Sequence, residues 1–271
     1  TSPREVQTVC QGAAVAAIPS STPLISGGNW ADQWVYGGIA QRYATAARLV
    51  YGDNLYMYGP NPGGPLREDL PNAATGPTGR TRAALAEQLL AAHAAGRIQV
   101  AIGRAPDFFG PRTLNATFGE RFFAAALAHK APDLIGKLDQ PHTYTFIRDF
   151  ASALVTLGQR DAALGQVWHV PSAATVTTGE MVALFGRELG TPLKPRMANL
   201  AMLTVLGWFN PMLREIKEMY PSFANPYVVD HSRFAASFGA SPTPHAEAVR
   251  ATVAWYRQQA IAASQRVVGR A

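Results

Sequence analysis

The feature that most constrains the fold is a strong helix that is followed at once by a strand. Residues 81–95 are rich in alanine and leucine and stop before Gly96, as the C-terminal ends of helices often do. The apolar run at 98–102 comes directly afterwards and indicates a buried strand. Because such a junction is half of the crossover that joins two parallel strands, we expect a parallel sheet.

Other segments continue this alternation of strands and helices. Strands are expected at 48–51 and 166–170, and helices at 148–157 and 178–189, the last with Thr177 or Thr178 as its N-cap. Residues 60–79 are rich in proline, glycine and asparagine and predict a long loop between a strand and a helix, a place where function often resides. The pattern as a whole predicts an α/β fold.

The composition excludes several classes of protein. With 271 residues, 48% hydrophobic and 15% charged, the chain can form a sizeable core and is not globally disordered. The net charge is +6, but the basic residues are scattered, so we expect no nucleic-acid partner. The apolar stretch at 198–209 is too short to span a bilayer and the N-terminus has no leader, so we expect no membrane partner and a cytoplasmic location.

Common motifs for phosphate, metal and nucleophile sites are missing from the sequence. Neither GxGxxG nor GxxxxGK[ST] occurs, and there is no GxSxG elbow and no HExxH. The single cysteine, Cys10, excludes an internal disulfide, and the six histidines are far apart, so we expect no metal site.

Tyr56 and Tyr58 form the most distinctive polar pair. If this segment is extended, two tyrosines two positions apart point the same way, with their hydroxyls at the carboxyl edge of the sheet. Ligands bind at that edge in open α/β folds. The alternative is that both rings belong to the core and that their hydroxyls bond backbone groups.

His142 and Tyr144 lie in a second polar cluster, just before the expected helix at 148–157. Imidazole can donate or accept a proton near neutral pH, which makes His142 a candidate, although a lone histidine is more often structural. Arg148 and Asp149 indicate a carboxylate at the start of a helix beside a surface arginine.

Arg104 and Asp107 follow the buried strand at 98–102. Side chains at that end of a strand are well placed to contact a ligand. An ion pair that fixes the loop is an equally good interpretation.

Taken in order, several segments resemble the NAD-dependent epimerase/dehydratase group, the extended short-chain dehydrogenase/reductases. The similar segments are 58–69, with Tyr58-Gly59 and Glu68; 104–111, which is similar to R-x-x-N-x-Y-G-P; 142–150, which is similar to the entry into a helix at V-D-D-V; 167–178, which is similar to N-V-G-S…T; and 229–257, which is similar to D-x-S-K…L-G…W-Y. The resemblance runs from about residue 48 to the C-terminus.

This resemblance implies a Rossmann-type parallel sheet with a smaller C-terminal substrate-binding region. Residues 1–105 would be the remaining part of the Rossmann-type domain, and 106–271 mainly the substrate-binding region, with strands that return to the sheet. The family begins with a βαβ unit whose Gly-rich turn binds the cofactor pyrophosphate. Residues 1–12 resemble a later helix, so we expect that unit to be absent. Residues 13–40 keep the family's spacing but not its pattern, which suits a compensated reading-frame slip.

The resemblance also implies a cofactor, NAD or NADP, and an altered catalytic site. Where the family has Y-x-x-x-K, a tyrosine acid/base and a ribose-binding lysine, this chain has Thr78 and Arg82. Asn54 falls at the family's serine or threonine. The expected catalytic residues are Asn54, Tyr56, Tyr58, Thr78 and His142; the expected cofactor-binding residues are Arg82, Ala105 and Pro106; the expected substrate-binding residues are Arg104, Asp107 and Tyr144.

Two functions follow from these observations. The first is an NAD(P)-dependent epimerase, dehydratase or reductase for a small hydroxylated substrate such as a nucleotide sugar, in which Tyr56, Tyr58 or His142 replaces the missing tyrosine. The second is a non-catalytic ligand-binding or regulatory protein on the same fold. Loss of the family's first strand would expose sheet edges, so we expect for either function a partner, such as a second copy in a homodimer, or extra residues upstream.

Overall fold

The computed structural model describes residues 24–26, 48–60, 63–207 and 219–268. The chain divides into two compact units. One consists of Thr1–Pro106, Arg148–Pro171 and Val228–Ser241, and the other of Asp107–Ile147, Ser172–Tyr227 and Pro242–Ala271. None of the helices in the described residues has the length and apolar character needed to cross a bilayer.

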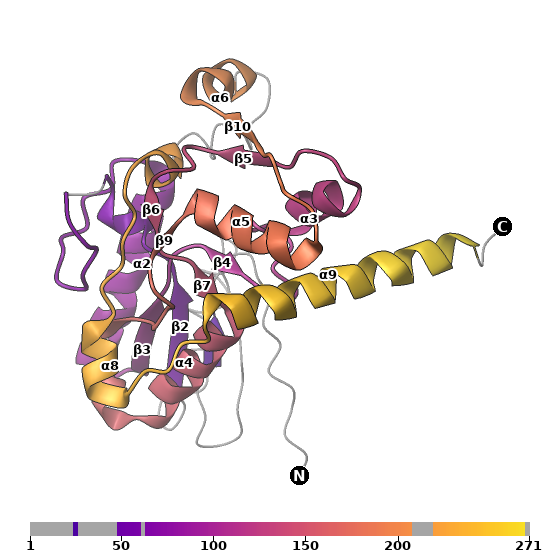
Figure 1. Ribbon diagram of the computed structural model, residues 1–271. Coiled ribbons are helices and arrows are strands. Elements are labelled where there is room, and N and C mark those ends of the chain that lie inside the picture. The colour runs from indigo at the N-terminus through magenta and orange to yellow at the C-terminus, as the bar shows by residue number, and fades with distance from the viewer. Residues whose placement is uncertain (1–23, 27–47, 61–62, 208–218, 269–271) are drawn as a thin grey trace, which may run out of the picture. The chain divides into compact units, whose positions relative to one another are not determined.

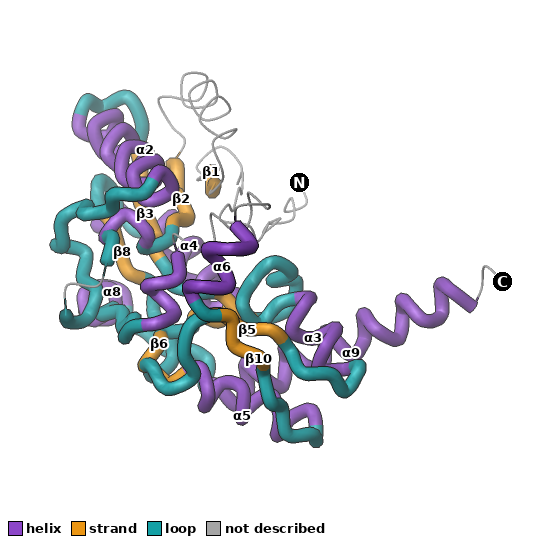
Figure 2. Tube along the Cα trace, turned by 90° about the horizontal axis from the view of Figure 1, so that it is seen from above, coloured by secondary structure: helices purple, strands orange, loops and turns teal. Residues whose placement is uncertain are grey.

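The first unit is built on a four-stranded sheet. Its strands are β1 (Leu24–Ser26), β2 (Arg48–Asp53), β3 (Gln99–Arg104) and β8 (Val167–His169). They lie in the order β1-β2-β3-β8, and every neighbouring pair is parallel (Figure 2). The predicted α/β fold with a parallel sheet is therefore confirmed. The three predicted strands correspond to β2, β3 and β8, with ends that differ by one or two residues.

Helices cover both faces of this sheet. Helix α2 (Pro77–Ala94) packs its leucines on the face that carries Tyr51 and Ile102. On the opposite face, α4 (Ile147–Gln159) lies over two strand glycines. A Cβ atom at Gly103 would come within 2.6 Å of Leu154, so a residue without a side chain is needed for this close approach.

Helix α2 begins four residues earlier than predicted. The sequence indicated a start at residue 81, but Pro77 occupies the first turn. Proline suits that position because its ring presets the helical φ and its missing N–H would have no helical partner there. The predicted stop is close to the observed one, since Gly96 follows the helix with φ +68°.

The extended segment expected at Tyr56 and Tyr58 is wrong. These residues form a short 3₁₀ turn, η1 (Tyr56–Tyr58). Asn54 starts the turn because its side-chain oxygen accepts the backbone N–H of Tyr56 at 3.0 Å. The two rings are therefore not strand neighbours: Tyr58 is buried, whereas Tyr56 is half-buried.

Three further features complete the first unit. Its remaining elements are η2 (Asp161–Ala163) and α8 (Ser232–Phe238). A β-bridge between Leu66 and Val229 anchors the loop before α2. Arg148 is exposed, and Asp149 lies in the first turn of α4, as predicted.

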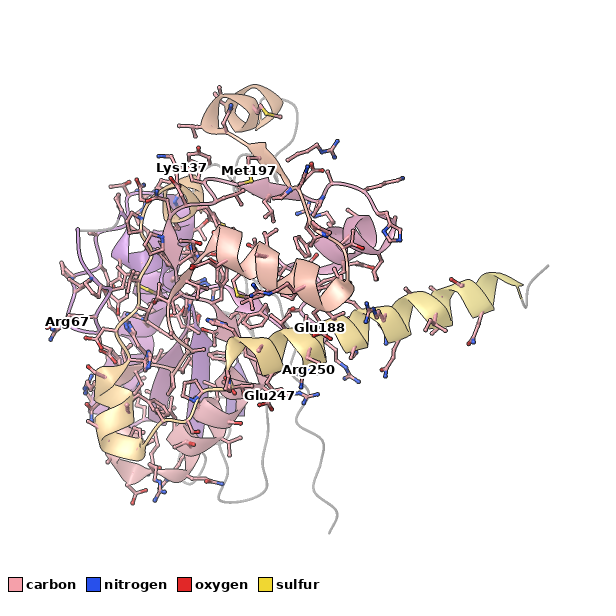
Figure 3. The ribbon with its side chains drawn as sticks, viewed as in Figure 1. Arg67, Lys137, Glu188, Met197, Glu247 and Arg250 are labelled. Atoms are coloured by element: carbon pink, nitrogen blue, oxygen red, sulfur yellow. The ribbon has the colours of Figure 1, made fainter. Side chains whose placement is uncertain are left out.

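The second unit has its own aromatic core beneath three helices. The helices are α3 (Glu120–Leu127), α5 (Thr178–Leu189) and α9 (His245–Val268), together with the shorter α6 (Leu200–Gly207). Its strands are β4 (Phe108–Phe109), β5 (Asp133–Ile135), β6 (Pro141–His142), β7 (Thr145–Phe146), β9 (Val176–Thr177) and β10 (Arg196–Ala198), paired as β4 with β7, β5 with β10 and β6 with β9. Helix α9 passes α5 and α3 and then projects beyond them (Figure 1). Its exposed Glu247 and Arg250 point outward (Figure 3).

Candidate functional site

Three polar side chains end three neighbouring strands of the parallel sheet. Asp53 is the last residue of β2, Arg104 of β3 and His169 of β8. The strand register places Asp53 beside Arg104 and Arg104 beside His169. All three are at most 4% exposed. They form a buried polar row at the carboxyl edge of the sheet, which is the edge where open α/β sheets bind ligands.

Asp53 and Arg104 form a buried ion pair. Arg104 Nε donates to Asp53 Oδ2 at 3.2 Å. Burial raises the pKa of the Asp53 carboxyl above its ordinary value, although Arg104 and, more weakly, Arg82 favour the charged form. The structure shows the ion pair that was one interpretation of Arg104, and the ligand contact stays a prediction.

Tyr58 connects Arg104 to His169, and the direction of its hydrogen bonds can be deduced. His169 Nδ1 lies 3.1 Å from the backbone oxygen of Asp230, which can only accept, so Nδ1 carries the proton. Burial lowers the pKa of His169 to about 4, so the ring is neutral near pH 7 and its Nε2 is an acceptor. Tyr58 Oη therefore donates to Nε2 at 2.9 Å and accepts from Arg104 Nη1 at 2.9 Å.

This arrangement makes Tyr58 a poor proton donor to a ligand. Its hydroxyl proton is directed at His169, and burial raises the pKa of the phenol despite the nearby Arg104. The loop after η1 also contacts this network: Glu68 Oε1 accepts the backbone N–H of His169 at 2.9 Å. Its neighbour Arg67 points away from the sheet (Figure 3).

The low pKa of His169 predicts a pH-dependent stability. An unfolded histidine binds its proton near pH 6.5, but His169 does so only near pH 4. The stabilisation that neutral His169 contributes is therefore complete above pH 6.5. As the pH falls toward 4, the free energy of unfolding drops by up to about 3 kcal/mol. We expect the free energy of unfolding, measured in urea, to fall more over this pH window for the unmodified chain than for His169→Gln. Parallel stability curves for the two proteins would contradict the assignment of a neutral His169.

A second group of candidates gathers where η1 meets the start of α2. Arg82 Nη1 donates to Tyr51 Oη at 2.8 Å and lies 3.8 Å from Asp53 Oδ1. Burial lowers the pKa of Arg82, but Tyr51, Asp53 and, after them, Tyr56 together raise it above its ordinary value. Thr78 is half-buried in the first turn of the same helix.

Gly79 allows this close packing of η1 and α2. A Cβ atom at Gly79 would lie 2.6 Å from the carbonyl oxygen of Tyr56 and 2.3 Å from the Ala74 methyl. Of the expected cofactor residues, Ala105 and Pro106 are also buried in this unit, and the Ala105 N–H donates to the Asp53 carbonyl at 3.2 Å.

The remaining candidates lie in the second unit. His142 Nε2 is 2.7 Å from Asp107 Oδ2, and the imidazole stacks on Phe223 and Tyr227. Its side chain is only 1% exposed, whereas that of Asp107 is 15% exposed. His142 is thus paired inside the unit.

Tyr144 is buried as well, and its hydroxyl is 2.9 Å from Thr178 Oγ1. Burial raises its pKa above that of an ordinary tyrosine. In the described part of the chain, no group of histidine, cysteine, aspartate or glutamate side chains could hold a metal ion.

Sequence reasoning missed Asp53, Glu68 and His169. The available signal was a polar residue near the end of a predicted parallel strand: Asp53 comes two residues after 48–51, and His169 is the next-to-last residue of 166–170. Glu68 contacts the site from a loop; the family resemblance included Glu68 but gave it no role at the site.

Comparison with known proteins agrees with this fold. Residues 39–170 match the model of the NAD dependent epimerase/dehydratase family. The matched part resembles that family and spans slightly less than half of the chain. A search of curated proteins returns no match.

Solved structures show the same fold. The UDP-glucuronic acid 4-epimerase from Bacillus cereus, in complex with UDP-glucuronic acid and NAD, is 17% identical with a TM-score of 0.67, covering 91% of this chain and 74% of that one. A UDP-N-acetylglucosamine 4-epimerase from Methanobrevibacter ruminantium has the same identity and TM-score, with 84% and 68% covered. For dTDP-glucose 4,6-dehydratase from Bacillus anthracis, in complex with NAD, the identity is 17% and the TM-score 0.62. The chain covers 64% of that dehydratase, and 82% of this chain is matched.

The match to the family model and the solved structures confirm the resemblance seen in the sequence. The expected absence of the Gly-rich unit is not tested by the described residues, and the atypical segment 13–40 lies outside them except for 24–26, which form β1.

Proposed function

We propose that the protein is an NAD(P)-dependent enzyme of the epimerase/dehydratase type that acts on a small hydroxylated substrate such as a nucleotide sugar. In this proposal residues 1–105 bind the cofactor and 106–271 mainly bind the substrate. The observation that carries the proposal is the position of Arg82. Its guanidinium lies at the carboxyl edge of the parallel sheet, between the Tyr51 hydroxyl and the Asp53 carboxylate, with Tyr56 nearby.

The residues at this edge fit one end of a nicotinamide dinucleotide. Arg82 offers several N–H donors that suit ribose or phosphate oxygens, and it takes the position of the family's lysine. Asp53 Oδ1 offers an acceptor, since no described residue donates a hydrogen bond to it. A bound nicotinamide dinucleotide would supply hydride acceptance and return. The solved relatives with NAD in their complexes support this choice of cofactor.

Among the candidate acids and bases, the geometry favours Tyr56. Tyr58 directs its proton at His169, and His142 is paired with Asp107. The aliphatic hydroxyl of Thr78 is a far weaker acid than a phenol, whose pKa is about 10. Tyr56 is a phenol, is only half-buried and lies near the cation of Arg82. It therefore combines the chemistry and the position that the reaction needs.

A non-catalytic ligand-binding protein is the second candidate. The replacement of the family's tyrosine and lysine by Thr78 and Arg82 favours it, because both changes fall at the catalytic pair.

One experiment separates the two candidates. The purified chain is incubated with NAD+ or NADP+ and a panel of UDP- and dTDP-hexoses, and both ligand retention and products are followed by mass spectrometry and chromatography. The enzyme proposal predicts an epimerised, dehydrated or oxidised sugar. Retention of a ligand without any product would favour the binding protein, and absence of both would contradict both candidates.

A further inference from the structure

The turn η1 is tied to the sheet through the side chain of Tyr58. This residue is only 2% exposed, and its hydroxyl contacts Arg104 at the end of β3 and His169 at the end of β8, each at 2.9 Å. The rings of Tyr58 and His169 also meet edge to face, with their centroids 5.6 Å apart. Tyr56 belongs to the same three-residue turn. The position of Tyr56 therefore depends on what holds Tyr58.

His169 accepts the proton of the Tyr58 hydroxyl only as a neutral imidazole. In that form its Nδ1–H donates to the Asp230 carbonyl at 3.1 Å, and its Nε2 is the acceptor. A protonated ring carries a hydrogen on both nitrogens, so Nε2 would become a donor toward an oxygen that already accepts from Arg104. The phenol would have to turn its own proton away, and an imidazolium would lie near a guanidinium. Protonation of His169 thus weakens the attachment of η1.

Charged groups on the neighbouring elements act on this imidazole. Burial is the largest influence and favours the neutral ring. Arg104, from β3, also opposes a second positive charge, whereas Asp230, from the segment before α8, favours it more weakly. The other titratable or charged groups around the network are Asp53 on β2, Arg67 and Glu68 in the loop after η1, His231 at the start of α8, and Arg233 of α8, which lies over the ring of Trp168. The pKa of His169 falls to about 4, so the attachment is intact near pH 7 and fails in acid.

We infer that His169 is a positioning residue, which holds the Tyr58 hydroxyl, and with it the η1 turn that carries Tyr56, only while its imidazole is neutral. The inference rests on the proposed function for the role of Tyr56 as acid or base. It makes the reaction sensitive to acid through a residue that acts by way of Tyr58, and His169 was absent from the sequence-based candidates.

The pH profile of turnover tests this role. The parameters kcat and KM are measured between pH 4 and pH 8 with NAD+ or NADP+ and the UDP- or dTDP-hexose that the panel above shows to be converted. His169→Gln keeps an acceptor for Tyr58 that does not titrate, and His169→Leu has none. His231→Gln is the matched control, because His231 is a half-buried histidine of the same unit whose pKa is also lowered by burial. Circular dichroism at each pH restricts the comparison to folded protein.

The inference predicts a different profile for each protein. In the unmodified chain kcat should rise with pH and reach half of its plateau near pH 4, with KM little changed. His169→Gln should keep most of the plateau and lose the acid limb, whereas His231→Gln should keep both. His169→Leu should lower kcat by about 10²-fold at every pH, the effect of displacing a catalytic group by about 1 Å.

Backbone hydrogen exchange of η1 gives a second readout that does not need turnover. The N–H groups of Tyr58 and Gly59 donate to the carbonyls of Leu55 and Tyr56, both at 3.2 Å. Their protection, corrected for the intrinsic pH dependence of exchange, should fall by about tenfold or more from pH 7 to pH 4, because opening of the turn lets His169 bind its proton. Protection of α5, in the other unit, should stay level, as should that of η1 in His169→Gln.

The two readouts separate the inference from the proposed function. An acid limb that is missing from the unmodified chain, or that survives in His169→Gln, would overturn the inference and leave the proposed function in place. Level protection of η1 in the unmodified chain would overturn it as well. If the unmodified chain forms no product at any pH, the proposed function fails, and hydrogen exchange still decides whether His169 holds η1.

Discussion

Replacing Arg104 with glutamine is expected to lower the free energy of unfolding by about 3–5 kcal/mol, the usual cost of breaking a buried ion pair from one side. Asp53 would keep its charge inside the protein, and among the described residues its remaining ion-pair partner would be Arg82, at 3.8 Å. Tyr58 would also lose the donor at 2.9 Å from its hydroxyl. Urea unfolding followed by circular dichroism measures the change.

Two further proteins make that result interpretable. Arg67→Gln removes an exposed arginine that pairs with exposed Asp69 at 3.3 Å, and it should cost at most about 1 kcal/mol. The double variant Asp53→Asn with Arg104→Gln should recover part of the loss, because no uncompensated carboxylate remains. A loss for Arg104→Gln no larger than that for Arg67→Gln would show that the pair does not hold the strand ends together.

Turnover is expected to fall by about 10²–10⁴-fold in Tyr56→Phe, the range for loss of a general acid or base. The ring is kept, so dinucleotide and sugar binding should change little. Product formation and calorimetric affinity are measured side by side. Tyr220→Phe, a half-buried tyrosine in the other unit, is the matched control.

Two results would refute this role for Tyr56. Unchanged turnover in Tyr56→Phe would assign the proton transfer to another group. A parallel loss of binding and turnover would instead mean that the hydroxyl supports ligand binding and not proton transfer.

The elements of the fold were accessible from local sequence patterns. The alternation of an alanine-rich helix with apolar strands predicted β2, β3, β8, α2, α4 and α5, and Thr177 caps α5 through a capping box with Glu180. The two errors, at Tyr56 and at the start of α2, arose where a single residue changes the backbone conformation. Asn54 turns the chain at Tyr56 through its own side chain, and Pro77 extends α2 backwards into the proline-rich loop.

The site was harder to predict because it depends on strand register. Asp53, Arg104 and His169 meet only because β2, β3 and β8 are neighbours with those residues aligned. The sequence identified Arg104 but left two interpretations open, since nothing local shows that Asp53 lies beside it.

The second unit shows the same limit. His142 and Tyr144 were found as a local cluster, but their partners Asp107 and Thr178 are 35 and 34 residues away. Such distant partners determine whether a polar side chain forms its hydrogen bond within the protein or remains available to bind a ligand.

The proposed activity is tested most directly by product analysis of the unmodified chain with NAD+ or NADP+ and a nucleotide sugar. The account predicts an altered sugar that forms only when a dinucleotide is present and that Arg82→Met forms more slowly. A chain that retains the dinucleotide and the sugar but returns every sugar unchanged would contradict it.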